Sequence, residues 1–134
     1  MRGLCYDDTE IFTRVWTAKK KMSEYPNKSN GYQAWITDLQ LIATDAPSGH
    51  PIIRECLDTA EMLIKKNISY GNSALDPIRI FSKADSKEQI RVRIDDKLNR
   101  IQNDQAFPGD NDIDDLIGYL ILLKIAKKSN ISVD

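Results

Sequence analysis

The sequence predicts an all-α fold, a compact bundle of about five helices within one domain that covers residues 1–134. Apolar residues recur three and four positions apart in several stretches, which is the spacing of one helix face. No stretch of useful length alternates apolar and polar residues as a half-buried strand would. The chain has 134 residues, 41% hydrophobic and 29% charged. It is therefore long enough to bury a core and has an ordinary globular balance.

Three helices are expected in the first half of the chain. The first should run from about residue 8 to 23, after the good capping residues Asp7 to Thr9. The second should cover residues 31–43. The third opens at His50-Pro51, because proline is tolerated in a first helical turn, and ends near Asn67. Its predicted buried face consists of Ile53, Cys56, Leu57, Ala60, Leu63 and Ile64.

The segment 68–85 shows little periodicity and is expected to be rich in loops. Gly71, Asn72 and Ser73 are turn residues, and Asp76-Pro77 predicts the start of one short helical turn. Internal segments of this length without clear structure are more often functional or mobile than idle. We therefore expect residues 70–84 to be the most mobile interior part of the chain and to become ordered when a ligand binds.

The strongest apolar periodicity lies in residues 86–126, which predict two helices joined by a turn at 107–110. Ser86 with Gln89 resembles a capping box at the start of the first of these helices. The apolar stripe of that helix is predicted to be Ile90, Ile94, Leu98 and Ile101. The last helix carries a broad apolar surface, Ile113, Leu116, Ile117, Leu120, Leu123 and Ile125. We expect that surface to be buried on more than one side. We also expect the chain to form a homo-oligomer through its last helix or its first.

Charge and cysteine content argue against several classes of protein. Nineteen basic and twenty acidic residues give a net charge of −1, which does not support general nucleic-acid binding. Two cysteines, Cys5 and Cys56, make neither a disulfide framework nor a zinc-binding pattern, which fits a reducing compartment. No apolar run approaches the roughly 20 residues of a membrane span, and no signal-peptide pattern is present. The sequence therefore predicts a cytoplasmic protein without membrane contact.

Carboxylates are concentrated at the start of the last helix. Asp112 and Asp115 are three residues apart and therefore neighbours on one helix face. One interpretation is that these carboxylates offset the helix dipole and accept hydrogen bonds from free N–H groups of the first turn. The other is that they bind a divalent cation such as Mg²⁺ jointly with a carboxylate from another helix. The spacing leaves both interpretations open.

Three motifs resemble those of a known family. They are KNISYGNS at residues 66–73, RVRIDDKLNR at 91–100 and DLIGYLIL at 115–122. In this order they resemble the KNxxYG turn, the R-x-x-D-K-x-x-R helix and the D-L-x-x-Y helix of the nucleotide-modification-associated domain of phages and bacteria. The resemblance covers about residues 52–127. It implies a nucleotide-binding protein, whose candidate nucleotide-binding residues are Lys66, Tyr70, Arg93, Lys97 and Arg100.

A broader likeness concerns the carboxylates. The stretch IDDLIGYLILL is similar to the last motif of MazG-like and dCTPase-like all-α NTP pyrophosphohydrolases, and LDTAEML at 57–63 is similar to their earlier E-x-x-E motif. Those enzymes hold Mg²⁺ with such carboxylates and cleave a nucleoside triphosphate to monophosphate and pyrophosphate. The resemblances thus imply Mg²⁺ as a cofactor. The candidate metal ligands are Asp58, Glu61, Asp96, Asp112 and Asp115.

Two functions are consistent with these features. The first is a nucleotide-binding protein of nucleotide metabolism or modification, with Mg²⁺-dependent NTP pyrophosphohydrolysis as its enzymatic form. Its partner would be a nucleotide or another small phosphorylated ligand, and no nucleophilic catalytic residue is identifiable. The alternative is a non-catalytic, phage-type interaction protein that binds a protein partner to block or recruit it. Whether the chain is an enzyme stays open between them.

Overall fold

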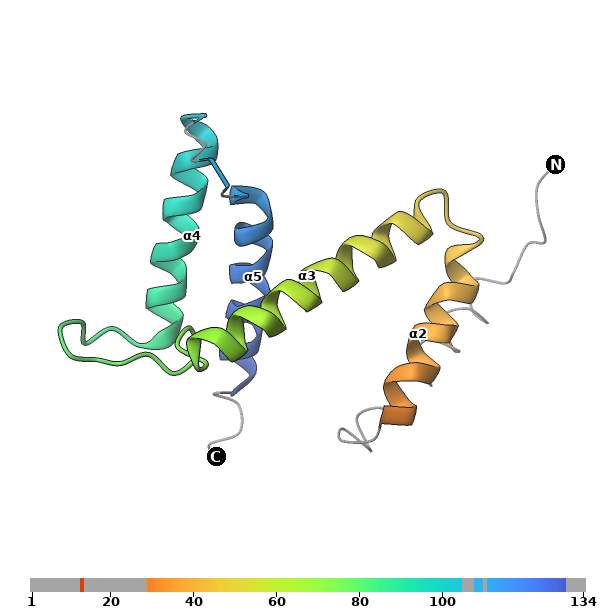
Figure 1. Ribbon diagram of the computed structural model, residues 1–134, viewed down its shortest axis with the longest axis horizontal. Coiled ribbons are helices and arrows are strands. Elements are labelled where there is room, and N and C mark those ends of the chain that lie inside the picture. The colour runs from red at the N-terminus through yellow and green to blue at the C-terminus, as the bar shows by residue number, and fades with distance from the viewer. Residues whose placement is uncertain (1–12, 14–28, 105–107, 110, 130–134) are drawn as a thin grey trace. The chain divides into compact units, whose positions relative to one another are not determined.

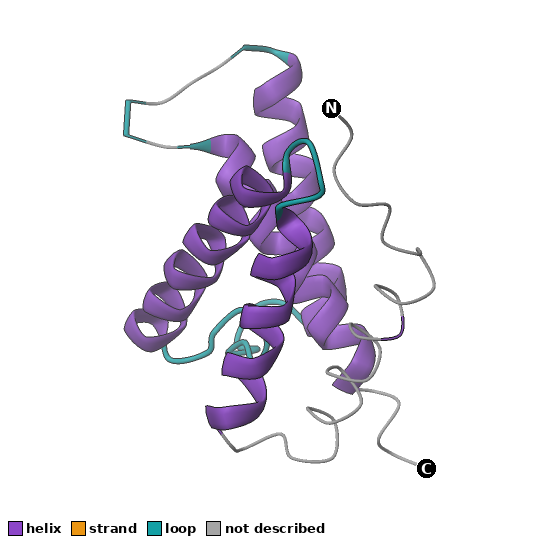
Figure 2. Cartoon of the chain, turned by 90° about the vertical axis from the view of Figure 1, so that its right-hand side faces the viewer, coloured by secondary structure: helices purple, strands orange, loops and turns teal. Residues whose placement is uncertain are grey.

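The computed structural model describes residues 13, 29–104, 108–109 and 111–129, which belong to two units. The first unit ends at Leu57 and the second begins at Asp58, and each is described by itself. The predicted all-α class is confirmed, since every described residue lies in a helix or a loop (Figure 2). Among the described residues there are four helices, and none of them is long and apolar enough to span a membrane. The first predicted helix lies outside the described residues except for Thr13, and the single domain stays a prediction.

In the first unit, a glycine allows two helices to meet closely. Helix α2 covers Ser29–Ala43, which confirms the second predicted helix with two more residues at its start, and α3 begins at Gly49. A Cβ atom on Gly49 would lie only 2.3 Å from the carbonyl oxygen of Ala43. Because that neighbour is backbone, a larger residue could not be accommodated without moving one of the two helices.

Helix α3, Gly49–Tyr70, continues three residues beyond its predicted end and is closed by a left-handed turn. Gly71 and Asn72 have φ angles of 60° and 62°, a conformation that glycine and asparagine tolerate better than other residues. The side chain of Asn67 donates a hydrogen bond of 2.8 Å to the side-chain oxygen of Asn72. A left-handed turn therefore ends α3 directly after Tyr70.

The predicted helical turn at Asp76-Pro77 is wrong. Residues 77–79 and 82–85 have no regular structure, and the segment forms an open loop between α3 and α4 (Figure 1). Pro77 has no N–H to donate, and no backbone–backbone hydrogen bond joins residues 77–83 to another described residue. Three large apolar side chains of this loop are exposed, Ile78 at 81%, Ile80 at 71% and Phe81 at 98%.

Helix α4, Ser86–Gln102, is capped by Asp85, which corrects the predicted capping box by one residue. The backbone N–H of Glu88 donates to the Asp85 carboxylate at 2.8 Å. The Gln89 side chain does reach back past the start of the helix, where its amide donates to the Ala84 carbonyl at 3.0 Å. Ser86 is thus the first helical residue, because Asp85 already supplies the capping acceptor.

Helix α5, Asp112–Ser129, packs against α4 (Figure 1). On α4, Ile90 is 2% exposed and Lys97 is 9% exposed, whereas Leu98 and Ile101 of the predicted stripe are exposed. The apolar surface predicted for α5 is only partly buried. Leu116 and Leu123 are half-buried, whereas Ile113, Ile117, Leu120 and Ile125 are exposed.

In the second unit, α3 contacts α5 at Gly118, which is buried. A Cβ atom there would lie 3.0 Å from a methyl group of Leu63 and 3.4 Å from the terminal methyl of Met62. The predicted buried face of α3 is therefore corrected at Ile64, which is 60% exposed, and Met62 takes its place. Cys56, Leu57 and Ala60 are exposed as well.

Candidate functional site

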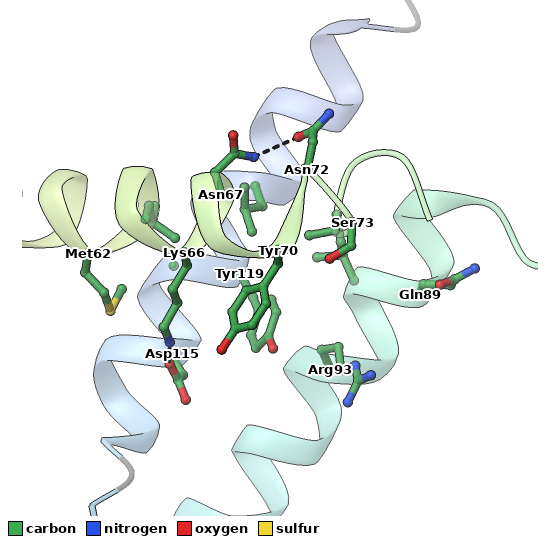
Figure 3. A pocket seen from close by; sticks show the side chains of 15 residues that line it. Met62, Lys66, Asn67, Tyr70, Asn72, Ser73, Gln89, Arg93, Asp115 and Tyr119 are labelled. Carbon is green, nitrogen blue, oxygen red and sulfur yellow. Dashed lines mark hydrogen bonds and ion pairs between the residues drawn. The ribbon is translucent and has the colours of Figure 1, made fainter. Parts of the chain in front are cut away.

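The second unit contains a cavity of about 390 Å³ between the end of α3, the start of α4 and the middle of α5 (Figure 3). Met62, Leu63, Ile90 and Leu122 contribute apolar surface, and every residue labelled in Figure 3 other than Met62 is polar or charged. These polar lining residues are Lys66, Asn67, Tyr70, Asn72, Ser73, Gln89, Arg93, Asp115 and Tyr119. A cavity of this size and mixed lining is typical of small-molecule sites.

Each of the three helices supplies a pair of lining residues four positions apart. The pairs are Lys66 and Tyr70 on α3, Gln89 and Arg93 on α4, and Asp115 and Tyr119 on α5. Residues four apart lie one turn above each other on the same helix face. Each helix therefore presents one polar strip to the cavity.

Lys66 and Asp115 form an ion pair across the cavity wall, from α3 to α5. The Lys66 ammonium lies 2.6 Å from a carboxylate oxygen of Asp115, and the two side chains are 47% and 18% exposed. This hydrogen bond raises the pKa of Lys66 against the opposing effect of burial, and the charges of Asp115, Tyr119 and Tyr70 raise it further. Lys66 is thus held in the cavity as a cation.

Behind the cavity wall, Lys97 is paired with two aspartates. Its ammonium lies 3.0 Å from Asp112 and 2.9 Å from the second oxygen of Asp115. A guanidinium nitrogen of Arg100 lies 3.7 Å from Asp112. Asp115 therefore bridges Lys66 and Lys97, and we call these five residues the lysine–aspartate network.

Within the network, Lys97 and Asp115 stay ionised although burial opposes both charges. Burial opposes the charge of Lys97, but hydrogen bonds from its ammonium to Asp115 and Asp112 outweigh this and raise its pKa. Burial likewise opposes the charge of Asp115, yet hydrogen bonds from Lys66 and Lys97 lower the pKa of its carboxyl. Buried charges of opposite sign that are hydrogen-bonded to each other are retained in this way.

The candidate nucleotide-binding residues divide into two groups. Lys66, Tyr70 and Arg93 line the cavity together, and the side chain of Arg93 has no ion pair or hydrogen bond to any other described residue. Lys97 and Arg100 do not line the cavity and are instead next to Asp112. Their role in the structure is to neutralise carboxylates.

The candidate metal ligands are not brought together. Asp58, Glu61 and Asp96 are exposed, and Glu61 pairs with Lys65 on the same helix. Asp112 and Asp115 are held by Lys97. Within the described ranges, no group of three or more Asp, Glu, His or Cys side chains is placed to hold a metal ion. Mg²⁺ binding by these carboxylates stays a prediction.

Neither interpretation of the first-turn aspartates anticipated what they contact. The capping role at the start of α5 is taken by Asn111, whose side-chain oxygen accepts a hydrogen bond of 3.2 Å from the Asp114 N–H. Asp112 and Asp115 are directed at Lys97 instead. They link α5 to α4 and, through Lys66, to α3.

Sequence reasoning missed five polar residues that line the cavity. They are Asn67, Asn72, Ser73, Gln89 and Tyr119. Two could have been found from spacing, because Gln89 is four residues before Arg93 and Tyr119 is four after Asp115. Asn67 lies on α3, one residue after Lys66, whereas Asn72 and Ser73 depend on the left-handed turn that Gly71 and Asn72 form after Tyr70.

All three sequence motifs meet at this cavity. The first supplies Lys66 and Tyr70, the second Arg93, and the third Asp115 and Tyr119. No protein-family model, curated protein or solved structure matches the chain. The resemblance to the nucleotide-modification-associated family therefore stays a prediction.

Proposed function

We propose that this protein binds a nucleotide in the cavity of its second unit. The observation that carries the proposal is the combination of two tyrosine rings with two cations around one cavity. In Figure 3 the rings of Tyr70 and Tyr119 lie between the Lys66–Asp115 pair and Arg93. Tyrosine offers a flat apolar face for a base and a hydroxyl for hydrogen bonding. Arginine binds phosphate oxygens through two N–H groups at once.

Arg93 is the residue best suited to bind the phosphate. Its guanidinium is free of any ion pair to the other described residues, so ligand binding breaks no existing contact there. Lys66 is shared with Asp115, and a phosphate would have to compete with that carboxylate. Gln89 and Ser73 add polar groups to the same part of the lining.

The network favours binding over metal-dependent hydrolysis. A metal-bound water would need carboxylates that are free to hold the cation. Asp112 and Asp115 are each within 3.0 Å of the Lys97 ammonium. Nucleotide binding therefore accounts for the arrangement better than pyrophosphohydrolysis does.

A thermal-shift assay tests the proposal, with Arg93→Gln as the variant and Arg91→Gln as the matched control. Arg91 lies on the same helix and pairs with Glu88 outside the cavity. A ligand at one hundred times its Kd should stabilise the wild type and the control by about 2.7 kcal/mol. Arg93→Gln should lose most of this stabilisation. Failure of nucleotides to stabilise any of the three proteins would contradict the proposal.

A second candidate function, binding to a protein partner, is favoured by the loop between α3 and α4. Ile78, Ile80 and Phe81 are at least 71% exposed, and residues 77–83 make no backbone–backbone hydrogen bond to another described residue. Clustered exposed apolar side chains mark interaction sites.

A photo-cross-linking residue at position 81 should trap a specific partner, whereas one at the exposed position of Val92 should not. Equal trapping at both positions would contradict this function.

A further inference from the structure

The charge lining the cavity limits which nucleotide it can bind. Two cations, Lys66 and Arg93, and one anion, Asp115, line it. Because Asp115 lies 2.6 Å from Lys66, the charge of that lysine is largely compensated, and Arg93 supplies the net positive charge of the lining. The lining thus carries one net positive charge.

The residues behind the cavity wall add little positive charge to that of the lining. The Lys97 ammonium lies next to Asp112 and Asp115 and is used to neutralise these carboxylates. Lys97 is only 9% exposed and does not line the cavity, so it makes no contact with a ligand there. The one net positive charge of the lining is therefore the charge that a ligand meets.

This charge matches a single phosphate group. A phosphomonoester carries about −1.5 to −2 at neutral pH. Arg93 is the one lining cation that is not paired with a described carboxylate, so each further phosphate would add negative charge without a cation of its own in the lining. The cavity volume of about 390 Å³ is near the lower end of the range for small-molecule sites, roughly 300–1,000 Å³.

A magnesium ion could offset the extra charge of a triphosphate only if carboxylates were free to hold it. Mg²⁺ in phosphate sites is typically bound by one or two carboxylates together with the phosphates. The carboxylate that lines the cavity, Asp115, is hydrogen-bonded to Lys66 and Lys97. Asp58, Glu61 and Asp96 do not line the cavity.

We infer that the cavity selects a nucleoside 5′-monophosphate, bound without a metal ion, over the corresponding triphosphate. Arg93 contacts the phosphate, and the base lies against Tyr70 and Tyr119. This inference rests on the proposed nucleotide-binding function. It differs from an NTP pyrophosphohydrolase, for which a triphosphate with Mg²⁺ would be the preferred ligand.

Isothermal titration calorimetry with matched ligand series tests the inference. The ligands are deoxyadenosine, dAMP and dATP, and thymidine, dTMP and dTTP, each titrated with Mg²⁺ and with EDTA. In at least one series the monophosphate should bind about tenfold or more tightly than both the nucleoside and the triphosphate, without change in EDTA. Arg93→Gln should weaken monophosphate binding to the level of the nucleoside. Arg91→Gln should bind like the wild type.

Two results would overturn the inference while the proposed function stands. One is tighter binding of a triphosphate that depends on Mg²⁺. The other is equal binding of nucleoside and monophosphate with no effect of Arg93→Gln. If none of the six ligands binds the wild type in either condition, the proposed function itself is contradicted.

Discussion

Lys97 contributes to stability in a way that apolar periodicity does not reveal. Lys97 lies seven residues after Ile90 and three residues after Ile94, so it shares the helix face that packs against α5. The pattern of apolar residues placed Leu98 there instead, and Leu98 is 49% exposed. An ammonium can occupy this buried position because Asp112 and Asp115 both accept hydrogen bonds from it.

Replacing Lys97 by methionine should destabilise the protein strongly. The substitution keeps a similar length but leaves two neighbouring carboxylates without their shared partner. Breaking a buried pair in this way costs roughly 3–5 kcal/mol, and we expect the lower end because Lys66 and Arg100 remain. The free energy of unfolding in urea measures the loss. The control is Lys65→Met, whose exposed pair with Glu61 should contribute nothing measurable, and equal stabilities of the two variants would contradict the account.

Asp115 should make stability fall in acid. Its pKa is lowered in the folded protein, so the stabilisation it provides is present above the pKa of the unfolded chain. That stabilisation is lost as the pH falls through the lowered value of the folded state. Lys66 and Lys97 have raised pKa values, so their contribution is complete below the ordinary lysine pKa and is lost as the pH rises through the raised values.

The variant Asp115→Asn tests this pH dependence. It should be less stable than the wild type at neutral pH, and the difference should shrink as the pH is lowered to about 2. Urea unfolding at a series of pH values measures both. A variant that is more stable than the wild type at neutral pH would indicate that repulsion among carboxylates, rather than pairing with lysines, dominates the site.

At the scale of elements, four predicted helices appear close to their expected bounds, while their buried faces were only partly predicted. Helix positions follow from local signals such as Pro51 and the turn residues after Tyr70. Buried faces depend on where neighbouring helices pass, which a single sequence does not encode locally. Gly118 illustrates this, since its lack of a side chain lets Leu63 and Met62 approach α5.

Gly118→Leu should therefore separate α3 from α5. Even a Cβ atom would lie 3.0 Å from Leu63, and a larger side chain would enter the cavity that Gly118 lines. Overpacking of this kind costs roughly 1–3 kcal/mol. We expect lower stability in urea and loss of nucleotide binding. Lys127→Leu, at an exposed position of the same helix, is the control, and a Gly118→Leu protein that binds as well as the wild type would contradict the proposed site.

The candidate site was predictable in part. The motifs identified Lys66, Tyr70 and Arg93, because each is a residue type that binds bases or phosphates in a recognisable context. The sequence marked Asp112 and Asp115 as candidate site residues but did not predict that they pair with Lys97. Lys97 and Asp112 are fifteen residues apart and lie on different helices. The contribution of Asn72 and Ser73 required the left-handed turn that the structure places after Tyr70.

For the whole molecule, the outer face of α5 favours self-association. Ile113, Ile117 and Leu120 recur at helical spacing and are 60%, 41% and 46% exposed. Such a surface is better covered by a second copy than left in water. The wild type should have a dimeric or larger mass by light scattering at high concentration, and Ile117→Lys should shift it to the monomer. A monomeric wild type across a wide concentration range would contradict this expectation.

If three distant segments of the chain form one nucleotide site, amide hydrogen exchange should respond to a bound nucleotide in all three. Exchange of the wild type should be compared without ligand and with saturating dAMP or dTMP. We predict slower exchange in three separate segments at once, 66–74, 89–93 and 115–122, and no such slowing in Arg93→Gln. Protection that is absent from all three segments, or confined to 77–83 or to α2, would contradict the account.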